Sequence, residues 1–519
     1  MSNGEPGSPC DPIRLAAPLA GRFAACGHLH ASKPKRPASG VAKTIRGSGR
    51  SPCIQVIASR KFTSIIATLF LIVSQSGCTN WSEDVALYQK ILNQNHPITR
   101  PTFTSHDSLT LVAALKLANA DNELIASRGE DYIQALADKM RQAGTFLPTL
   151  SVAPSYSLEN GSSISTVGLP GSIQQLVAGN SGTVHQFTVP LNASATGSLA
   201  NLSAWQAAGL TADQRAQLLL DERETILLQV VQSYYSVLKA ERQTAVYENS
   251  LKFKAEKVRD QEARLKLGNV RPLDLAQTQA DLAATRVSLV QSHSDSSNAR
   301  SALARLIGVR AVNGPLSDAF DPPRDVPTLE QWQQQAPMSR QDLLAAARAV
   351  ESARLSLQAA IREYFPSVSI NFSYFLYNDP ISPEKWSGVF SASIPIFSAL
   401  AIEADIRKAW SAYRQAGLAE SQTCRQVTDD INQSFRNLQG SREKIADLQV
   451  EVEAAQRAFE LSERAYQLGS VSNLDRLTQQ DNLLTAQLNL VSEQFNEKSN
   501  YLSVLRSAGQ LSSVLRRAH

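Results

Sequence analysis

The chain repeats one stretch, Leu267-Gly268-Asn269-Val270-Arg271-Pro272-Leu273-Asp274, 201 residues later as Leu468-Gly469-Ser470-Val471-Ser472-Asn473-Leu474-Asp475. The same shift carries Gln279 onto Gln480, Leu289 onto Leu490 and Gly308 onto Gly509. A register held from residue 267 to residue 509 predicts two copies of one unit. In each copy two long helical patterns flank a Gly turn, which is typical of a helical hairpin.

Charge is distributed unevenly along the 519 residues. The net charge is +4, but residues 1–78 hold ten Lys or Arg and two Asp or Glu, which leaves 41 basic and 45 acidic residues in 79–519. The body is therefore mildly acidic, and we expect no nucleic-acid partner. Only Cys424 lies beyond residue 78, and His and Met are scarce, so we expect neither a disulfide framework nor a metal site or other cofactor.

The N-terminal segment has the features of a leader. Residues 1–60 are rich in Pro, Gly, Ser and Arg, and we expect them to be disordered or an over-extended start of translation. In residues 61–78 a basic flank precedes an apolar run of about nine residues, which is typical of an export signal. Ser76-Gly77-Cys78 resembles a bacterial lipobox, in which the Cys is lipidated, although Gln75 stands where that motif has an aliphatic residue. Lipidation of Cys78 and ordinary signal cleavage nearby both remain open.

Past residue 100, helical patterns alternate with short strands. Helices are predicted at 109–144, at 341–363 and from Phe397 to Gly469. Period-two alternation predicts strands at 149–156, 186–191, 367–374 and 390–396, with an apolar face and a face of Ser, Thr and Asn. The Gly/Ser-rich segment 157–184 is predicted to be an extracellular loop.

Four amphipathic strands lack a partner sheet of their own, and their pattern fits an outer-membrane barrel better than a soluble sandwich. Because four strands cannot close a barrel and an open edge cannot stand in lipid, the chain is expected to oligomerise. The sequence divides into the leader (1–60), the export signal (61–78), a first repeat (79–310), a Pro-rich linker or belt (311–338), a second repeat (339–512) and a tail (513–519). A smaller counterpart of the linker is predicted at 197–212.

The long helices carry coiled-coil seams. In the second copy a strict 3,4 spacing joins Ile445, Leu448, Val452, Ala455, Phe459, Ser462 and Tyr466, and in the first copy the seam includes Leu275, Leu282 and Leu289. A periplasmic structural coiled-coil protein is the alternative that these helices alone would allow. The interposed strands and the export signal argue against it.

The order of helix, strand pair, long helix, turn and helix, made twice, resembles the TolC-like outer membrane efflux protein family. The pattern Gly-x5-Asp-x4-Gln at both turns, Ser339-Arg340-Gln341-Asp342-Leu343 and Phe365-Pro366 are further marks of that family. The resemblance covers about residues 100–512. It implies a mainly α fold with a small β part: a homotrimer whose strands form a twelve-stranded transmembrane β-barrel in outer-membrane lipid, continuous with an α-barrel that crosses the periplasm. It also implies a periplasmic adaptor protein and an inner-membrane pump as partners, in the manner of the lipoprotein branch that serves resistance-nodulation-division pumps.

The same resemblance places a constriction at the periplasmic turns. It implies that Asp475 forms an acidic ring, that Asp274 is its counterpart in the first copy, and that Tyr466 is an aromatic gate residue. A second acidic position of the family is Thr478 here. Symmetry-related carboxylates at a constriction favour cations and raise one another's pKa.

Several roles at the turns stay open. Arg271 is expected to pair with an acidic group across the tip and act as a latch. Gly268 and Gly469 are expected to form the turns and to expose a groove for adaptor helices. The alternative for Asp274 and Asp475 is that each is only a cap or first-turn acid of its helix, and Tyr466 lies on the seam.

No nucleotide-binding, hydrolase or metalloprotease motif is present in the sequence, so we do not expect an enzyme. The function expected is a passive outer-membrane exit channel of a tripartite efflux pump for drugs or other small toxic compounds. An exit duct of a type I protein secretion system is the alternative with the same fold.

Overall fold

The computed structural model describes residues 81–93, 103–160, 183–379 and 385–513. The expected leader and export signal, with Cys78, lie outside these residues, as does most of the tail. The chain divides into two compact units, and every described residue from Val85 onward belongs to the same one of them. The first helix of the described chain, α2, spans Trp81–Leu92.

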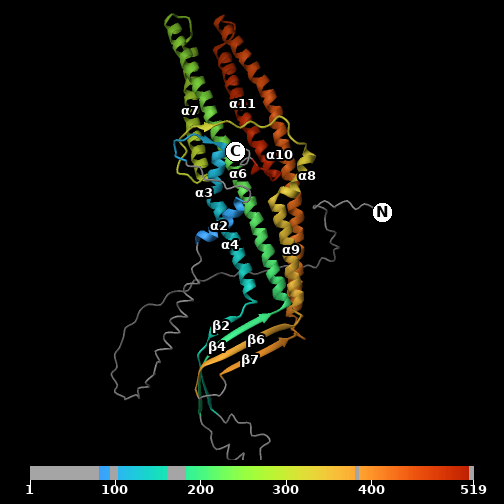
Figure 1. Cartoon of the computed structure of the whole chain (residues 1–519). Helices are drawn as coiled ribbons and strands as arrows, with labels where there is room; N and C mark the ends of the chain where they lie inside the picture. The colour runs from blue at the N-terminus through green and yellow to red at the C-terminus, as the bar shows by residue number, and fades with distance from the viewer. Residues whose placement is uncertain (1–80, 94–102, 161–182, 380–384, 514–519) are drawn as a thin grey trace, which may run out of the picture. The chain divides into compact units, whose positions relative to one another are not determined.

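Two long helices of 68 and 67 residues dominate the structure (Figure 1). Each turns back at a Gly into a helix of 35 residues, and each contacts a helix of 22 residues toward its other end. The first copy contains α6 (Leu199–Lys266), α7 (Pro272–Leu306) and α4 (Glu123–Gly144). The second contains α10 (Ala401–Gln467), α11 (Asn473–Ser507) and α9 (Gln341–Arg362). The doubled helical hairpin predicted from the repeated stretch is confirmed.

The elements keep one order from the sheet into the helices. The main path of the sheet runs through β2 (Thr149–Val152), β4 (Thr183–Gly197), β6 (Ser367–Asp379) and β7 (Trp386–Ser393). Each strand adjoins a helix in the chain, and α4, α6, α9 and α10 neighbour one another in the same order. Farther along, α7 packs on α6, and α11 packs on both α6 and α10. The chain is therefore a strip with two edges: β2, α4 and α7 form one, and β7 and α10 form the other.

The shorter helices meet end to end in both copies. Asn122, between α3 (Leu111–Asp121) and α4, donates from Nδ2 to the carbonyl oxygen of Leu306 near the end of α7, at 2.9 Å. In the second copy Arg340, between α8 (Leu329–Ser339) and α9, donates to the carbonyl oxygen of Ser507 at 3.3 Å. These hydrogen bonds satisfy carbonyl groups in the last turn of a helix, which have no partner within their own helix.

Glycine is required where these helix ends meet. Gly308 and Gly509, which the repeat aligns, both have φ of +72°. A Cβ at Gly308 would lie 2.8 Å from the carbonyl oxygen of Asp121, and one at Gly509 would lie 2.5 Å from that of Ser339. Both the backbone conformation and the close approach therefore exclude a side chain.

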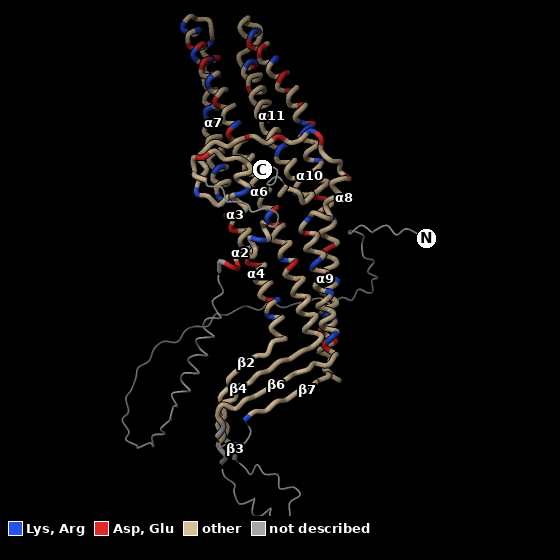
Figure 2. Tube along the Cα trace, viewed as in Figure 1, with Lys and Arg blue, Asp and Glu red and all other residues tan. Residues whose placement is uncertain are grey.

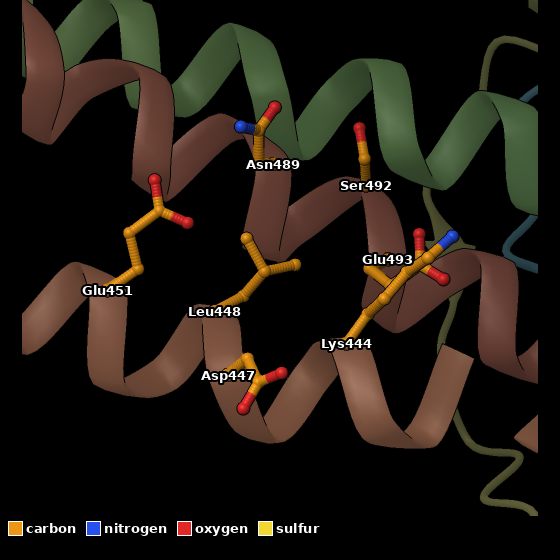
Figure 3. Close-up of a pocket in the computed structure, with 7 residues that line it drawn as sticks. All are labelled: Lys444, Asp447, Leu448, Glu451, Asn489, Ser492 and Glu493. Atoms are coloured by element: carbon orange, nitrogen blue, oxygen red, sulfur yellow. The ribbon is translucent and has the colours of Figure 1, made fainter. Parts of the chain in front are cut away.

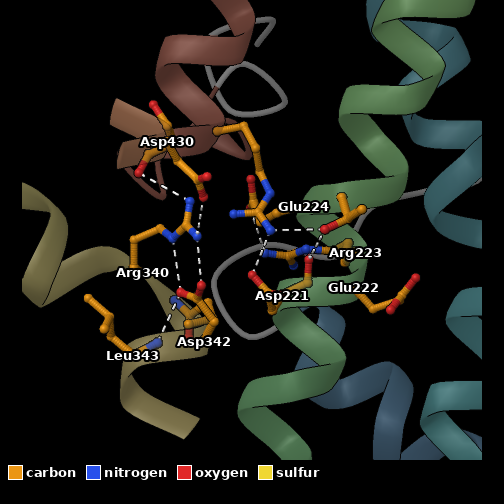
Figure 4. Close-up of polar contacts among 12 residues, drawn as sticks. Asp221, Glu222, Arg223, Glu224, Arg340, Asp342, Leu343 and Asp430 are labelled. Atoms are coloured by element: carbon orange, nitrogen blue, oxygen red, sulfur yellow. Dashed lines mark hydrogen bonds and ion pairs between the residues drawn. The ribbon is translucent and has the colours of Figure 1, made fainter. Parts of the chain in front are cut away.

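A buried ion-pair network fixes the second junction (Figure 4). The guanidinium of Arg340 is nearly inaccessible and contacts Asp342 at 2.6 Å and Asp430 of α10 at 3.2 Å. Beside it, Arg506 of α11 donates to Asp221 of α6 at 2.7 Å. Because a buried charge that loses its partner is costly, these contacts hold four helices in one arrangement.

A belt crosses the middle of the long helices, where the hydrophobic core lies. Its short strand β5 (Leu316–Ser317) pairs in parallel with β1 (Leu109–Thr110). The hydroxyl of the fully buried Tyr234 lies 2.8 Å from the carbonyl oxygen of Leu109 and 2.6 Å from that of Ser317, and its one proton is shared between these acceptors. Ser317 therefore attaches the belt to α6 through this hydroxyl.

The sheet has one apolar face. Its register places Ala193 opposite both Leu150 and Phe372, and Ile370 opposite Phe390. Opposite residues of an antiparallel pair point to the same face, so these side chains form one apolar surface. Leu150 and Phe390 are 72% and 71% exposed. Figure 2 shows that charged residues lie along the helices and are sparse on the strands.

The other face of the sheet is polar, as the alternation predicts. The hydroxyls of Thr149 and Ser194 lie 2.7 Å apart, as do those of Ser369 and Ser391. Small hydroxyl side chains thus hydrogen-bond to one another across neighbouring strands.

Prolines interrupt the first strand pair. The predicted strand 149–156 is broken at Pro154 into β2 and β3 (Ser155–Asn160), and both pair with β4. On β4 the register with β6 shifts between Val189 and Pro190. Pro cannot donate to a ladder, so it marks an edge or a bulge.

Several predicted boundaries are wrong. The helix expected over 109–144 is two helices, α3 and α4, because Asn122 leaves the helical conformation and caps α4. The linker expected at 197–212 is instead the start of α6, where Ser198 is the N-cap and the segment packs on α9. The linker 311–338 contains most of α8.

Three further boundaries shift. The expected loop 157–184 is shorter, because β3 continues to Asn160 and β4 begins at Thr183. The last strand ends at Ser393 rather than at 396, and α10 begins at Ala401 rather than at Phe397. Between them Ala399 and Leu400 have positive φ angles of 49° and 68°, which ordinary residues rarely adopt. The division into two repeats and a linker stays a prediction.

Candidate gate at the hairpin turns

The two turns share one backbone geometry. After α6, the N–H groups of Gly268 and Asn269 donate to Leu265 and Arg264, and after α10 those of Gly469 and Ser470 donate to Tyr466 and Ala465. This pattern is the Schellman motif, which needs a left-handed residue. Gly268 and Gly469 have φ of +75° and +73°, and no atom lies within 4 Å of a Cβ built there. Glycine is needed here for its conformation alone, and both turns are exposed.

Asp475 is a first-turn acid of α11 and a partner in a capping box. Its backbone N–H donates to Ser472 Oγ at 3.1 Å, and its carboxylate accepts from the Ser472 hydroxyl at 2.7 Å. The carboxylate also accepts from the backbone N–H of Ser472 at 3.2 Å, and these two hydrogen bonds from Ser472 lower the pKa of the exposed Asp475 carboxyl. One turn later Thr478 is exposed and donates to the carbonyl oxygen of Leu474.

The carboxylate of Asp274 has different partners from that of Asp475. Its carboxylate is nearly buried and accepts both Nε and Nη2 of Arg271, at 3.1 and 3.0 Å. Arg271, whose side chain is 69% exposed, therefore contacts an acid of its own turn within the described chain, where a partner across the tip was expected. Asp274 lies in the first turn of α7, as the alternative for this residue required.

Tyr466 lies between the two hairpins. Its hydroxyl accepts from Gln261 Nε2 of α6 at 3.3 Å, and the guanidinium of Arg476 lies 5.1 Å from its ring centroid. Burial raises the pKa of the Tyr466 hydroxyl, and the charge of Asp274 adds to that effect. The phenol is therefore neutral and acts as a hydrogen-bonding and cation-stacking group.

Asn473 joins the turns. This fully buried residue donates from Nδ2 to the carbonyl oxygen of Asp274 at 3.0 Å. Its Oδ1 accepts from Arg476 at 2.9 Å and from Gln261 at 3.3 Å. A single side chain of the second hairpin (α10 and α11) thus contacts both helices of the first hairpin (α6 and α7).

Glu463 is the acidic centre of this contact. It accepts from Lys257 of α6 at 2.6 Å and from Arg476 at 3.3 Å. Burial alone would raise the pKa of Glu463, but the hydrogen bonds and charges of Lys257 and Arg476 outweigh it, and the pKa is lowered. The network consists of charged and polar groups that water can also satisfy, so the hairpins can separate at modest cost.

Four residues of this network were not predicted from the sequence: Arg476, Asn473, Lys257 and Glu463. The sequence holds one signal that points to Arg476. The 201-residue shift aligns Arg476 with Leu275, a Leu of the seam in the first copy. Arg476 is 1% exposed. A charged residue where the other copy has a seam Leu indicates a contact that the second copy alone makes.

A groove between α10 and α11 lies well before the turns (Figure 3). Three carboxylates, one ammonium group and the apolar Leu448 face it, and its lining residues are Lys444, Asp447, Leu448, Glu451, Asn489, Ser492 and Glu493. It is distinct from the exposed surface of the two turns.

The sequence model of the outer membrane efflux proteins matches residues 115–309 and 332–510, which together exceed half of the chain. The chain belongs to the outer membrane efflux protein family. It is therefore a transport protein of the bacterial outer membrane, and it extends into the periplasm.

Individual outer membrane proteins are also similar to this chain in sequence and in structure. The cation efflux system protein CusC of Escherichia coli strain K12 is 23% identical over 356 residues, which cover 65% of this chain and 76% of CusC. A crystal structure of CusC gives a TM-score of 0.67 at 19% identity, covering 79% of this chain and 96% of that one. The CmeC outer membrane channel of Campylobacter jejuni gives 0.66 at 16% identity, with 82% and 92% covered. These likenesses confirm a mainly helical fold with a small sheet.

Among the helices that the structure describes, none carries an apolar stretch sufficient to cross a bilayer. Within the same residues, no group of three or more His, Cys, Asp or Glu is arranged to hold a metal ion.

Glu463→Gln tests the network between the hairpins. At pH 7 we expect a loss of roughly 3 kcal/mol, the low end for a buried pair, because Glu463 is partly exposed. The folded-state pKa of Glu463 is lowered, so its contribution is present above the unfolded pKa of about 4.3 and is lost as the pH falls through the folded value. Thermal unfolding in detergent at several pH values measures this difference. The exposed Glu460→Gln is the control, and a deficit of Glu463→Gln that persists in acid would contradict the account.

Proposed function

We propose that three copies of the chain close into one tube. The sheet ends at two unpaired edges, β2 with β3 on one side and β7 on the other. Its apolar face is exposed, which suits contact with lipid, but a lipid-embedded edge needs a backbone partner. Pairing β7 of one copy with β2 and β3 of the next satisfies both edges. With β2 and β3 counted as one strand interrupted at Pro154, each copy has four strands, and three copies supply twelve. A head-to-tail contact that closes on itself is a cyclic oligomer.

The edge helices support the same contact. On α7 the side chains of Val287 and Val290 are 70% and 62% exposed, and on α10 those of Val450 and Leu461 are 65% and 63% exposed. These helices form the outer edges of the strip beyond the belt, so each presents apolar surface to a neighbouring copy. Burying such surface between copies is favourable.

The tube is the exit duct of a tripartite efflux pump, and it moves small toxic compounds passively. The observation that carries this proposal is the continuity of α6 and α10: each begins beside the sheet and ends at an exposed turn. A periplasmic adaptor contacts the turns at Gly268 and Gly469, and an inner-membrane pump supplies the cargo. Family membership removes the structural coiled-coil alternative.

Transport is tested in cells that lack this protein. We expect intracellular dyes and drugs to accumulate severalfold more than in the parent strain, and a plasmid copy to restore the parent level. Metal cations belong in the same panel because the relative CusC is named a cation efflux protein. Unchanged accumulation across the whole panel would overturn small-molecule efflux. Loss of a secreted protein from the medium would instead identify a type I secretion duct.

At the narrow end, Asp475 of each copy lines the constriction, with Asp274, Arg271 and Tyr466 behind it. The capping box keeps Asp475 charged in the single chain, and three such carboxylates around one axis attract cations.

Asp475→Asn should lower the cation-to-anion permeability ratio of the purified protein in planar bilayers by up to about tenfold. The reason is that the ring of three negative charges, and with it the local attraction for cations, is removed. Asn can still accept the Ser472 hydrogen bond, so the start of α11 should remain intact. Glu443→Gln, an exposed change elsewhere on α10, is the control. An unchanged reversal potential would show that Asp475 only caps its helix.

We also propose that Cys78 is lipidated and anchors the mature chain. The proposal rests on Ser76-Gly77-Cys78 after the apolar run. Mass spectrometry of the mature N-terminus should find diacylglyceryl on Cys78. An unmodified Cys, or cleavage at another residue, would reject the anchor.

A further inference from the structure

A second contact between the hairpins lies away from the turns. Lys254 of α6 is 2% exposed, and its ammonium contacts Asp281 of α7 at 2.7 Å and Asp481 of α11 at 2.9 Å. One buried cation therefore has one carboxylate in its own hairpin and one in the other. Lys254 precedes Gly268 by 14 residues, a distance of roughly 20 Å along the helix.

The two carboxylates differ in exposure. The side chain of Asp281 is 13% exposed, whereas that of Asp481 is 57% exposed. If α11 moves away, water can solvate Asp481, and Lys254 keeps Asp281 as its partner. The contact across the hairpins can therefore break and re-form without leaving an unpaired buried charge.

The other copy shows that a hairpin of this design does not need the buried cation. The 201-residue shift places Lys254 on Ala455, a member of the second seam, and Asp281 on Asn482. The second hairpin folds with an Ala and an amide at these positions. The charges of the first hairpin thus serve something other than formation of the hairpin itself.

We propose that Lys254, Asp281 and Asp481 form a clamp that holds the second hairpin against the first. The clamp lies on the helices at a distance from the turns, and it opposes opening of the duct. Lys254 is a positioning residue: it touches no cargo, and it sets how far α11 moves relative to α6. Among the described residues no hydrogen bond or ion pair links the clamp to the network around Glu463 and Arg476, although the charge of Arg476 acts on Asp281, so the two hairpins are held at two levels. The inference rests on the proposed duct.

Asp481→Asn is the sharpest test, because it removes only the negative charge of the contact across the hairpins, at an exposed position. Purified full-length protein in planar bilayers should show an open fraction roughly fivefold or more above the parent protein, the size of a typical coupling between sites. Lys254→Met should do the same, whereas Asp481→Glu should behave like the parent. Lys252→Met, an exposed change on the same helix, is the control.

Thermal unfolding of each variant separates a clamp from a structural role. The clamp predicts that Asp481→Asn raises the open fraction while the unfolding temperature stays near that of the parent. If Asp481→Asn conducts like the parent while Lys254→Met alone opens or unfolds, Lys254 only packs its own hairpin and the clamp is refuted. If the parent protein conducts while neither variant changes its open fraction, the clamp fails and the duct stands. A parent protein that forms no conducting pore overturns the duct itself.

Discussion

Unpaired backbone groups at the two edges of the sheet are the constraint on which the rest of the structure depends. In lipid such groups have no water to bond with, so an open four-stranded strip is stable only if its edges meet partners. The two edges of the sheet continue into the helical part, because each strand adjoins a helix and the helices keep the strand order. In the proposed tube, a neighbour that pairs with β7 would therefore also meet α10. One contact between copies would then serve the sheet and the helices together.

The interior of each copy is held by two kinds of contact. Around the belt, the buried core and the network of Arg340 fix the long helices where the shorter helices meet end to end. Toward the turns, the hairpins meet through Glu463, Arg476, Asn473 and Lys254, which are polar or charged, and through the aromatic pair Phe253 and Phe459. Apolar packing is favourable wherever it can form, whereas polar contacts are nearly balanced against hydration. In the part of the molecule proposed to move, the polar contacts are the ones that water can replace.

Much of this architecture is visible in the sequence, because the repeated turn and the strand alternation are local patterns. The glycines at 268 and 469 predict the turns through their backbone conformation, and the aligned glycines at 308 and 509 mark the helix ends. The start of α6 was misjudged because Gly209 and several polar residues weaken its helical pattern. Packing against α9, where Thr211 and Ser352 hydroxyls lie 2.9 Å apart, overrides that weakness.

The contacts between hairpins could not be predicted in the same way. Arg271 and Asp274 are three residues apart, yet nothing in the sequence shows that they pair with each other rather than with a partner across the tip. Lys254 and Asp481 are 227 residues apart and meet only because the strip brings α6 beside α11. A charged residue opposite an apolar seam position of the other copy is the one local sign of such contacts, and it applies to both Arg476 and Lys254.

The proposed closure of the sheet can be checked by measuring the mass of the detergent-solubilised protein under native conditions. We expect a complex of three chains that needs detergent to stay in solution and separates into single chains only on unfolding. A single folded chain, soluble in water without detergent, would contradict it, since the edges and the apolar face of the sheet would then need no neighbour.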